Sequence, residues 1–385
     1  MKQKKKAGMA LLCNQMILMA MILSSTGLAL PRLKEEIGLT PVQQGSLVSI
    51  QYFGFTIAVL LGGILLDKFG KLRILSLSFG ILAFASFLFG AASQYWMTVL
   101  GVLLIGGFGS ITQNALISLA TGYDKQNAEK NNAFINMFFT VGAVLTPMLL
   151  LIFMLLFSKW RYAYYLVGGL CLMVALITSG YRDEKTGNQL SFKNTISIYI
   201  KALKTPSYLI APSALFLYVG AEIGIWGFAP VFFENQGYGR VSGILASILI
   251  WVSMFAGRSL SVRLLKSYNM SRILIAHGIL AVVALTCVIF SGQTASIIWI
   301  GISGFACAPF YPLLVTWMTR ITGEKSSSAL ALAMAFGSMG AVLAGWISGM
   351  VVDNWGARYI TAVPAFSLVL VVVLLAVFKN KRTAE

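Results

Sequence analysis

Twelve apolar runs occupy most of the 385 residues of the chain. A helix needs about 20 mainly apolar residues to cross the hydrocarbon core of a bilayer, and each run is long enough. Hydrophobic residues make up 58% of the sequence and charged residues 11%, too few charges to solvate a globular surface of this size. The sequence therefore predicts an all-α polytopic membrane protein with twelve transmembrane helices in a lipid bilayer. The runs cover residues 9–31, 45–66, 73–92, 96–121, 132–156, 161–180, 208–234, 241–265, 272–292, 295–320, 327–352 and 357–378.

Basic residues are distributed unevenly between the two sides of these helices. The chain has 29 lysines and arginines and a net charge of +17. With the N-terminus inside, Arg258 falls within a helix and most of the others fall on the inner side. This positive-inside bias predicts a protein of the cytoplasmic membrane with both termini in the cytoplasm. Because topology and anionic lipid head groups explain the charge, we expect no nucleic-acid partner. The outer basic residues are Arg32, Lys34, Lys159, Arg161, Arg240 and Arg358.

Residues that carry out chemistry are sparse. The sequence has one histidine and four cysteines, and the cysteines fall inside predicted helices without a CxxC spacing. We therefore expect neither disulfides nor a metal site. The sequence has no glycine loop for binding nucleotide phosphates and no nucleophile paired with a base. These features predict a protein that is not an enzyme, has no cofactor and draws any concentrating power from an ion gradient.

The sequence of the first half of the chain is partly repeated in the second half. Gly142 opens the sequence Gly-Ala-Val-Leu, which recurs 198 positions later at Gly340, and Gly-x-Ala followed closely by proline occurs both near Pro31 and near Pro230. We predict an N-terminal six-helix half at 1–180, a cytoplasmic linker at 181–207 and a C-terminal six-helix half at 208–385. Parallel halves of this kind bind substrate at their interface and alternate access around it. Residues 191–204 favour an interfacial helix, with a solvated linker as the alternative.

Residues 62–71, with the sequence GGILLDKFGK, resemble the signature between helices 2 and 3 of the major facilitator superfamily. The resemblance extends over the whole chain and implies that superfamily's twelve-helix fold. It also implies a cytoplasmic gate at this loop. The predicted gating residues are Gly63, Asp67, Lys68, Gly70, Lys71 and Arg73.

Three shorter stretches, at 107–115, 218–230 and 308–312, resemble the fucose-permease-type sugar transporters. This resemblance implies transport of a sugar with a proton. Proton-coupled members of that branch tend to carry carboxylates in helices 1 and 4, and here those two predicted helices contain no Asp or Glu. Their coupling scheme therefore cannot be carried over to this chain.

Glu222 is the one acid predicted to lie deep within a membrane helix. A carboxylate near the bilayer centre costs roughly 2.5–3.5 kcal/mol on insertion scales, so it persists only for a reason. Tyr218 and Trp226 lie four residues to either side and share its helical face. An acid between two aromatic rings suits a sugar-binding site, and Glu222 is also our predicted proton carrier. The alternative is a protonated glutamate that ties its helix to a neighbour.

Other polar and aromatic side chains are predicted to face the interior of the helix bundle, where such groups either hold helices together or contact substrate. Asn114 and Ser118 share one face of helix 4, with Gln113 beside them. Together with Glu222, Tyr218 and Trp226, the predicted substrate-binding residues are Asn114, Gln113, Ser118, Gln51, Tyr52, Asn136, Phe139 and Tyr311.

Asp67 is predicted to lie at the inner mouth of helix 2. Helix 11 is expected to begin nearby, after residues 326–328, and the exposed N–H groups of a helix N-terminus attract a carboxylate. This contact would form a latch that holds one transport conformation. The alternative is a charge that serves only as a topology anchor.

These features together favour a secondary active transporter, expected to be monomeric, that imports a small polar solute. A sugar is the first candidate for the solute and a proton for the coupling ion. The alternatives are an efflux antiporter for amphipathic drugs or lipids and, from another class, a non-transporting membrane sensor.

Overall fold

The computed structural model describes residues 2–123, 127–181, 206–265, 267–321 and 327–382. Within these ranges the regular secondary structure is helical. Twelve spans are long and apolar enough to cross a membrane, which confirms the predicted number and the all-α fold class. The predicted interfacial helix at 191–204 lies outside the described residues.

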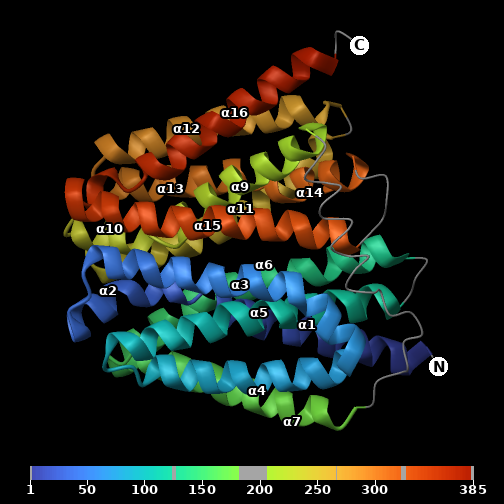
Figure 1. The fold of residues 1–385 in the computed structure, drawn as a ribbon. Helices are drawn as coiled ribbons and strands as arrows, with labels where there is room; N and C mark the ends of the chain where they lie inside the picture. Colours follow the sequence, from blue (N-terminus) through green and yellow to red (C-terminus); the bar gives the residue numbers. More distant parts are fainter. Residues whose placement is uncertain (1, 124–126, 182–205, 266, 322–326, 383–385) are drawn as a thin grey trace. The chain divides into compact units, whose positions relative to one another are not determined.

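The first six spans are built from seven helices, because the first span contains two. Figure 1 shows them in blue to green, with α4 and α7 side by side. They are α1 (Lys2–Leu23), α2 (Thr26–Ile37), α3 (Pro41–Phe69), α4 (Lys71–Gly90), α5 (Tyr95–Tyr123), α6 (Ala128–Phe157) and α7 (Arg161–Ser179).

Three of the last six spans contain a break, after Trp226 in the seventh, after Cys307 in the tenth and after Tyr359 in the twelfth. The elements are α9 (Pro206–Trp226), α10 (Ala229–Asn235), α11 (Arg240–Leu264), α12 (Met270–Phe290), α13 (Gln293–Cys307), α14 (Phe310–Ile321), α15 (Ser327–Trp355), the short 3₁₀ helix η2 (Ala357–Tyr359) and α16 (Ala362–Arg382).

The first span is longer than the sequence predicted. It was expected to end at Pro31, but the break falls after Leu23 and α2 then continues through Pro31 to Ile37. A proline within a membrane helix is tolerated where neighbouring groups satisfy the freed backbone. In the seventh span, Pro230 instead lies in the first turn of α10, where its missing N–H group would have had no helical partner.

The chain forms two compact units. One contains Met1–Ala29 and Ile50–Phe192, and the other contains Leu30–Ser49 and Lys193–Glu385. The second unit therefore includes a segment from the predicted N-terminal half. Within this unit a Cβ atom on Gly45 would lie 2.8 Å from the Cα atom of Gly349 on α15. This close backbone contact attaches Leu30–Ser49 to the C-terminal helices.

Glycine contacts inside each unit repeat at the interval found in the sequence. A Cβ atom on Gly142 of α6 would meet the carbonyl oxygen of Ile17 on α1. In the other unit, a Cβ atom on Gly340 of α15 would meet the carbonyl oxygen of Phe216 on α9. Phe216 follows Ile17 by 199 positions, and Gly340 follows Gly142 by 198. The repeated sequence therefore marks a repeated helix contact.

A second pair of contacts shows the same repeat. Gly106 of α5 lies against the carbonyl oxygen of Gln51 on α3, and Gly304 of α13 lies against that of Ile250 on α11. Both residues in the second contact follow their counterparts by 198 or 199 positions. Small residues let membrane helices approach closely in this way. The two units are therefore built on one packing plan.

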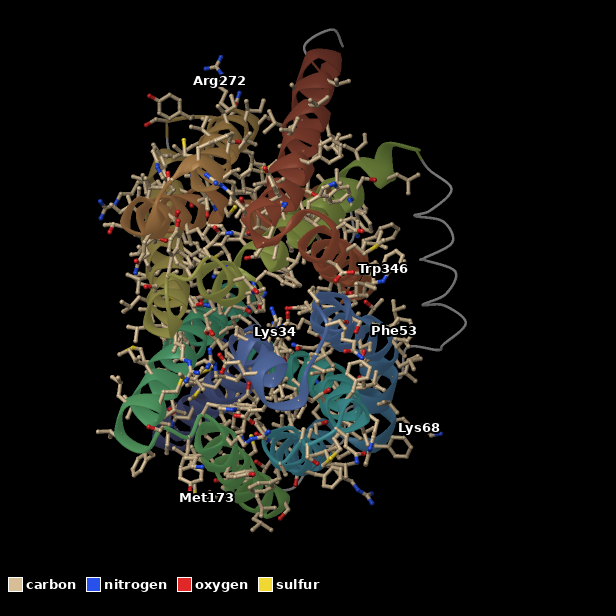
Figure 2. The ribbon with its side chains drawn as sticks, turned by 90° about the vertical axis from the view of Figure 1, so that its left-hand side faces the viewer. Lys34, Phe53, Lys68, Met173, Arg272 and Trp346 are labelled. Carbon is tan, nitrogen blue, oxygen red and sulfur yellow. The ribbon has the colours of Figure 1, made fainter. Side chains whose placement is uncertain are left out.

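Large apolar side chains cover the outside of each unit. Phe53, Met173 and Trp346 point away from their helices (Figure 2), and their exposed fractions are 54%, 50% and 49%. In water such a surface would drive aggregation. In a bilayer it is the surface expected to contact lipid tails.

Candidate functional site

Glu222 lies on α9 within the seventh span, Leu209–Trp226, and its side chain is half-buried. It lies one turn after Tyr218 on the same helix, and the two side chains interact electrostatically. It also lies close enough to Arg258 of α11 to interact with it electrostatically. The deep carboxylate predicted from the sequence therefore has two polar neighbours.

Tyr218 is completely buried. Its ring stacks on Phe310 of α14 with centroids 5.1 Å apart and an interplanar angle of 7°. Its hydroxyl donates a hydrogen bond to the carbonyl oxygen of Cys307, at 3.0 Å. That carbonyl lies where the tenth span breaks between α13 and α14, so Tyr218 satisfies a backbone group that the break leaves without its helical partner. Phe310 covers the face of the Tyr218 ring. The contribution of Tyr218 to the site is therefore its hydroxyl group.

We expect Tyr218→Phe to lower the stability of the protein by about 1 kcal/mol, because it removes one hydrogen bond and retains the stack on Phe310. The midpoint of thermal unfolding in detergent measures this effect. Tyr359→Phe is the matched control, since Tyr359 is 48% exposed. Equal unfolding midpoints for the two variants would show that the bond to Cys307 contributes no stability.

Trp226 is half-buried and packs against Trp251 of α11, with ring centroids 5.6 Å apart. This contact joins α9 and α11, which run in opposite directions because a short connection joins successive spans. Glu222 lies about 6 Å along α9 from Trp226, and Arg258 lies about 10 Å along α11 from Trp251, in the same direction. An arginine side chain covers the difference, consistent with the interaction between Glu222 and Arg258.

Tyr311 of α14 is also half-buried. It lies close enough to Glu222 and Arg258 to interact electrostatically with both. We call Tyr218, Glu222, Arg258, Tyr311 and the Cys307 carbonyl the Glu222 cluster. All five belong to the C-terminal unit. The sequence predicted three of them. It placed Arg258 inside a helix without assigning it a partner, although a second charge within a span was the available signal.

The remaining predicted substrate-binding residues belong to the N-terminal unit. On α5, Asn114, Gln113 and Ser118 are half-buried. The amide of Asn114 lies against α3, where a Cβ atom on Gly62 would be 3.3 Å from its Nδ2. Phe139 on α6 is also half-buried. Contact of these residues with substrate stays a prediction.

Three further predicted residues already have contacts within this unit. Gln51 is buried, and its Nε2 donates to the carbonyl oxygen of Leu23 at 2.8 Å, at the break between α1 and α2. Tyr52 is buried beside Phe55, with ring centroids 6.1 Å apart. Asn136 bonds one turn back along α6. Gln51 thus resembles Tyr218, since each satisfies a carbonyl at a broken span.

The predicted gating residues lie around the turn between α3 and α4. Gly70 has a φ of 94°, a conformation that favours glycine, and this explains the last glycine of the signature. Asp67 is half-buried and interacts electrostatically with Lys71.

The other gating residues are accessible. Lys68 and Arg73 are exposed, and a Cβ atom on Gly63 would meet open space. Figure 2 shows Lys68 at the periphery. Residue 326, near the predicted start of helix 11, is outside the described residues, so the latch at Asp67 stays a prediction.

Comparison with known proteins agrees with this architecture. The chain is 24% identical to the glucose/mannose transporter GlcP of Bacillus subtilis over 336 residues, 84% of this chain and 83% of the relative. The fold is similar to that of the nucleoside transporter NupG, with a TM-score of 0.77 at 15% identity, covering 95% of this chain and 99% of the other. It also resembles the E. coli fucose:proton symporter FucP, with a TM-score of 0.66 at 17% identity, covering 97% and 98%.

A family model described as Major Facilitator Superfamily matches residues 12–303 and 272–385, which together include nearly the whole chain. The resemblance drawn from residues 62–71 is therefore confirmed. The chain belongs to the Major Facilitator Superfamily.

Proposed function

We propose that the chain is a secondary active transporter that moves a small polar solute, with a sugar as the first candidate, across the cytoplasmic membrane. The solute moves with a proton by alternating access, and Glu222 carries the proton. The observation that supports this proposal is a half-buried carboxylate inside the seventh span, one turn from Tyr218 and within the electrostatic influence of Arg258. An ionisable group inside a membrane marks a functional site by default.

The names of two similar proteins support the same proposed function. One is named a glucose/mannose transporter and another a fucose:proton symporter. We propose that both termini face the cytoplasm, on the strength of the basic residues that concentrate on that side. The work of the protein would then be transport rather than catalysis.

Purified protein in proteoliposomes tests this proposal. An inwardly directed proton gradient should drive uptake of at least one radiolabelled sugar from a panel, and a protonophore should abolish the uptake. The panel includes amphipathic drugs. Proton-driven extrusion of a drug, with no uptake of any sugar, would favour the efflux alternative.

The proposed cytoplasmic gate gives a separate expectation for Asp67→Asn. Transport should slow about tenfold while the Kd for the solute changes less than twofold, because a carboxylate at a helix terminus typically contributes about 0.3–1 kcal/mol to one conformation and up to about 2 kcal/mol when partly buried. Equilibrium binding and initial uptake rates measure the two quantities. A tenfold weaker Kd with normal turnover would contradict a gating role for Asp67.

A further inference from the structure

A cavity of about 530 Å³ is lined by residues of α3, α4 and α5 in the N-terminal unit. Its walls are mostly apolar, and none of its lining residues is acidic. Arg73 and Ser78 of α4 contribute polar groups to it. The charge bias predicts that this cavity opens toward the cytoplasmic side. The apolar lining residues are Leu65, Phe69, Ile74, Leu77, Phe108 and Ile111.

Ser78 is the most deeply buried polar residue of this lining. It is 1% exposed, and its Oγ has no hydrogen-bond partner among the described residues. Leaving a buried hydroxyl without a partner is unfavourable. Ser76, which also lines the cavity, donates instead to the carbonyl oxygen of Ala175 at 2.8 Å. Ser78 can therefore donate to an acceptor that enters the cavity.

The C-terminal unit fills the corresponding place with a side chain of its own. His277 of α12 follows Ser78 by 199 positions, the interval that relates the two units. Its Nδ1 donates to the carbonyl oxygen of Ala306 on α13 at 3.1 Å. Ala306 follows Phe108 by 198 positions. The imidazole thus joins two helices of the C-terminal unit, whereas Ser78 and Phe108 line a cavity in the other unit.

We propose that this cavity binds an anionic phospholipid of the cytoplasmic leaflet, with an acyl chain along the apolar walls and the phosphate against Arg73. Basic pockets between membrane helices on the cytoplasmic side suit the head groups of anionic lipids. A guanidinium has five N–H donors, so Arg73 can contact a phosphate while it keeps contacts within the protein. The Nζ of Lys68 lies 5.2 Å from the ring centroid of Phe69 and adds positive charge beside the cavity.

The spacing along α4 fits the depth of a phospholipid in the bilayer. Ser78 lies five residues after Arg73, which is about 7.5 Å along a helix. The head-group region is about 5–8 Å deep on each side of a bilayer. With Arg73 at the phosphate, Ser78 therefore lies where the acyl esters meet the hydrocarbon, and its hydroxyl donates to an ester carbonyl. This site is separate from the Glu222 cluster, and its test requires no transport.

Delipidated protein in detergent tests the site. Native mass spectrometry at increasing lipid concentration measures the Kd for dioleoylphosphatidylglycerol and for dioleoylphosphatidylcholine, which has the same acyl chains and no net charge. Phosphatidylglycerol should bind at least tenfold more tightly than phosphatidylcholine. Arg73→Gln should weaken its binding at least fivefold, and Ser78→Ala should weaken it about threefold.

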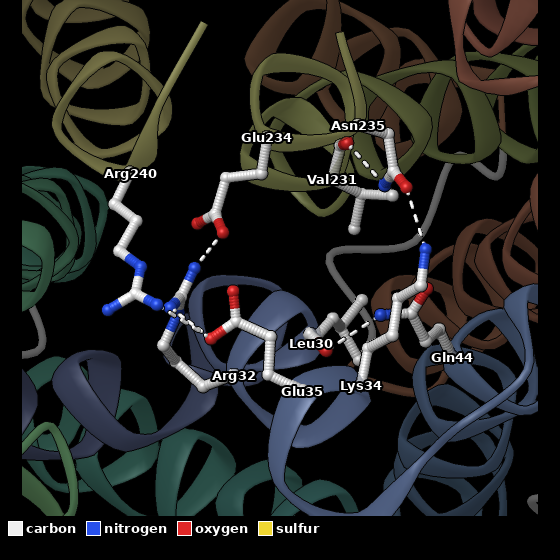
Figure 3. A network of polar contacts seen from close by, with 9 residues as sticks. All are labelled: Leu30, Arg32, Lys34, Glu35, Gln44, Val231, Glu234, Asn235 and Arg240. Carbon is white, nitrogen blue, oxygen red and sulfur yellow. Dashed lines mark hydrogen bonds and ion pairs between the residues drawn. The ribbon is translucent and has the colours of Figure 1, made fainter. Parts of the chain in front are cut away.

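Two exposed arginines provide matched controls. Arg272→Gln removes the arginine that repeats Arg73 on α12 (Figure 2). Arg240→Gln removes an arginine on the opposite predicted side, where it pairs with Glu35 at 3.0 Å (Figure 3). Neither change should alter the Kd for phosphatidylglycerol more than twofold, because neither residue lines the cavity.

Ser78→His introduces the side chain that the C-terminal unit carries at this place. It should weaken binding of phosphatidylglycerol at least tenfold, because the imidazole occupies the cavity and donates to the carbonyl oxygen of Phe108. Its unfolding midpoint without lipid should equal or exceed that of wild type. Ile111→Phe fills the cavity from α5 and should weaken binding in the same way, so the test does not depend on the folding of one variant.

Equal affinity for the two lipids would overturn the proposal. So would wild-type affinity for phosphatidylglycerol in Arg73→Gln and in the two variants that fill the cavity. Glycerol 3-phosphate carries the phosphate without acyl chains, and a tenfold excess of it should not displace the lipid. Displacement would show a site for a free phosphate ester and would contradict a lipid site.

Discussion

Glu222→Gln should abolish proton-driven accumulation of the solute while exchange of solute across the membrane survives. Glutamine keeps the shape and most of the hydrogen bonds of glutamate but cannot carry a proton. Uphill accumulation requires proton movement, whereas exchange requires only alternating access. Accumulation should fall to the equilibrium level, and exchange should stay within a few-fold of wild type.

Two assays in proteoliposomes separate these quantities, namely uptake driven by a proton gradient and counterflow of labelled against unlabelled solute. Asp353→Asn is the control, since it removes an exposed carboxylate at the end of α15. Loss of both activities would indicate a binding role, because losing a hydrogen-bond acceptor weakens binding by about 1–3 kcal/mol. Full proton-driven accumulation in Glu222→Gln would exclude Glu222 as the carrier.

Gly340→Ala should be among the most destabilising single-methyl changes in the chain. The added Cβ atom would meet the carbonyl oxygen of Phe216 and lie 2.7 Å from its carbonyl carbon, both backbone atoms that cannot rotate away. Forcing α15 from α9 costs about 1–3 kcal/mol or more. Gly142→Ala should behave alike, because the repeat places it against the carbonyl of Ile17.

Thermal unfolding in detergent measures this cost. Gly169→Ala is the matched control, because a Cβ atom on Gly169 would meet nothing within 4 Å. In a helix this change is neutral or stabilising by about 0.5–1 kcal/mol. If Gly340→Ala and Gly169→Ala unfolded at the same temperature, the close contact between α9 and α15 would be wrong.

The number and place of the spans could be predicted because a bilayer requires long apolar runs, which a sequence shows directly. The repeat was also visible, since Gly142 and Gly340 begin the same four residues. The course of the first span could not be predicted from Pro31 alone. Whether a proline ends a membrane helix depends on which neighbours satisfy the freed carbonyl, and that is decided by tertiary packing.

The sequence likewise predicted part of the candidate site. Helical periodicity placed Tyr218, Glu222 and Trp226 on one face, because residues four apart share a face. It could not show that Phe310 covers the ring of Tyr218 or that Arg258 approaches Glu222. Those contacts depend on the register between helices, which the spacing within one helix does not determine.

Proton movement that follows the solute is the most direct test of coupled transport by this chain. Proteoliposomes with a pH-sensitive dye inside and no imposed proton gradient receive an inward solute gradient, with solute uptake recorded in parallel. The interior should acidify in wild type as solute enters, and Glu222→Gln should take up solute down its gradient without acidification. Entry of solute into wild-type vesicles with no change in internal pH would contradict proton coupling through Glu222.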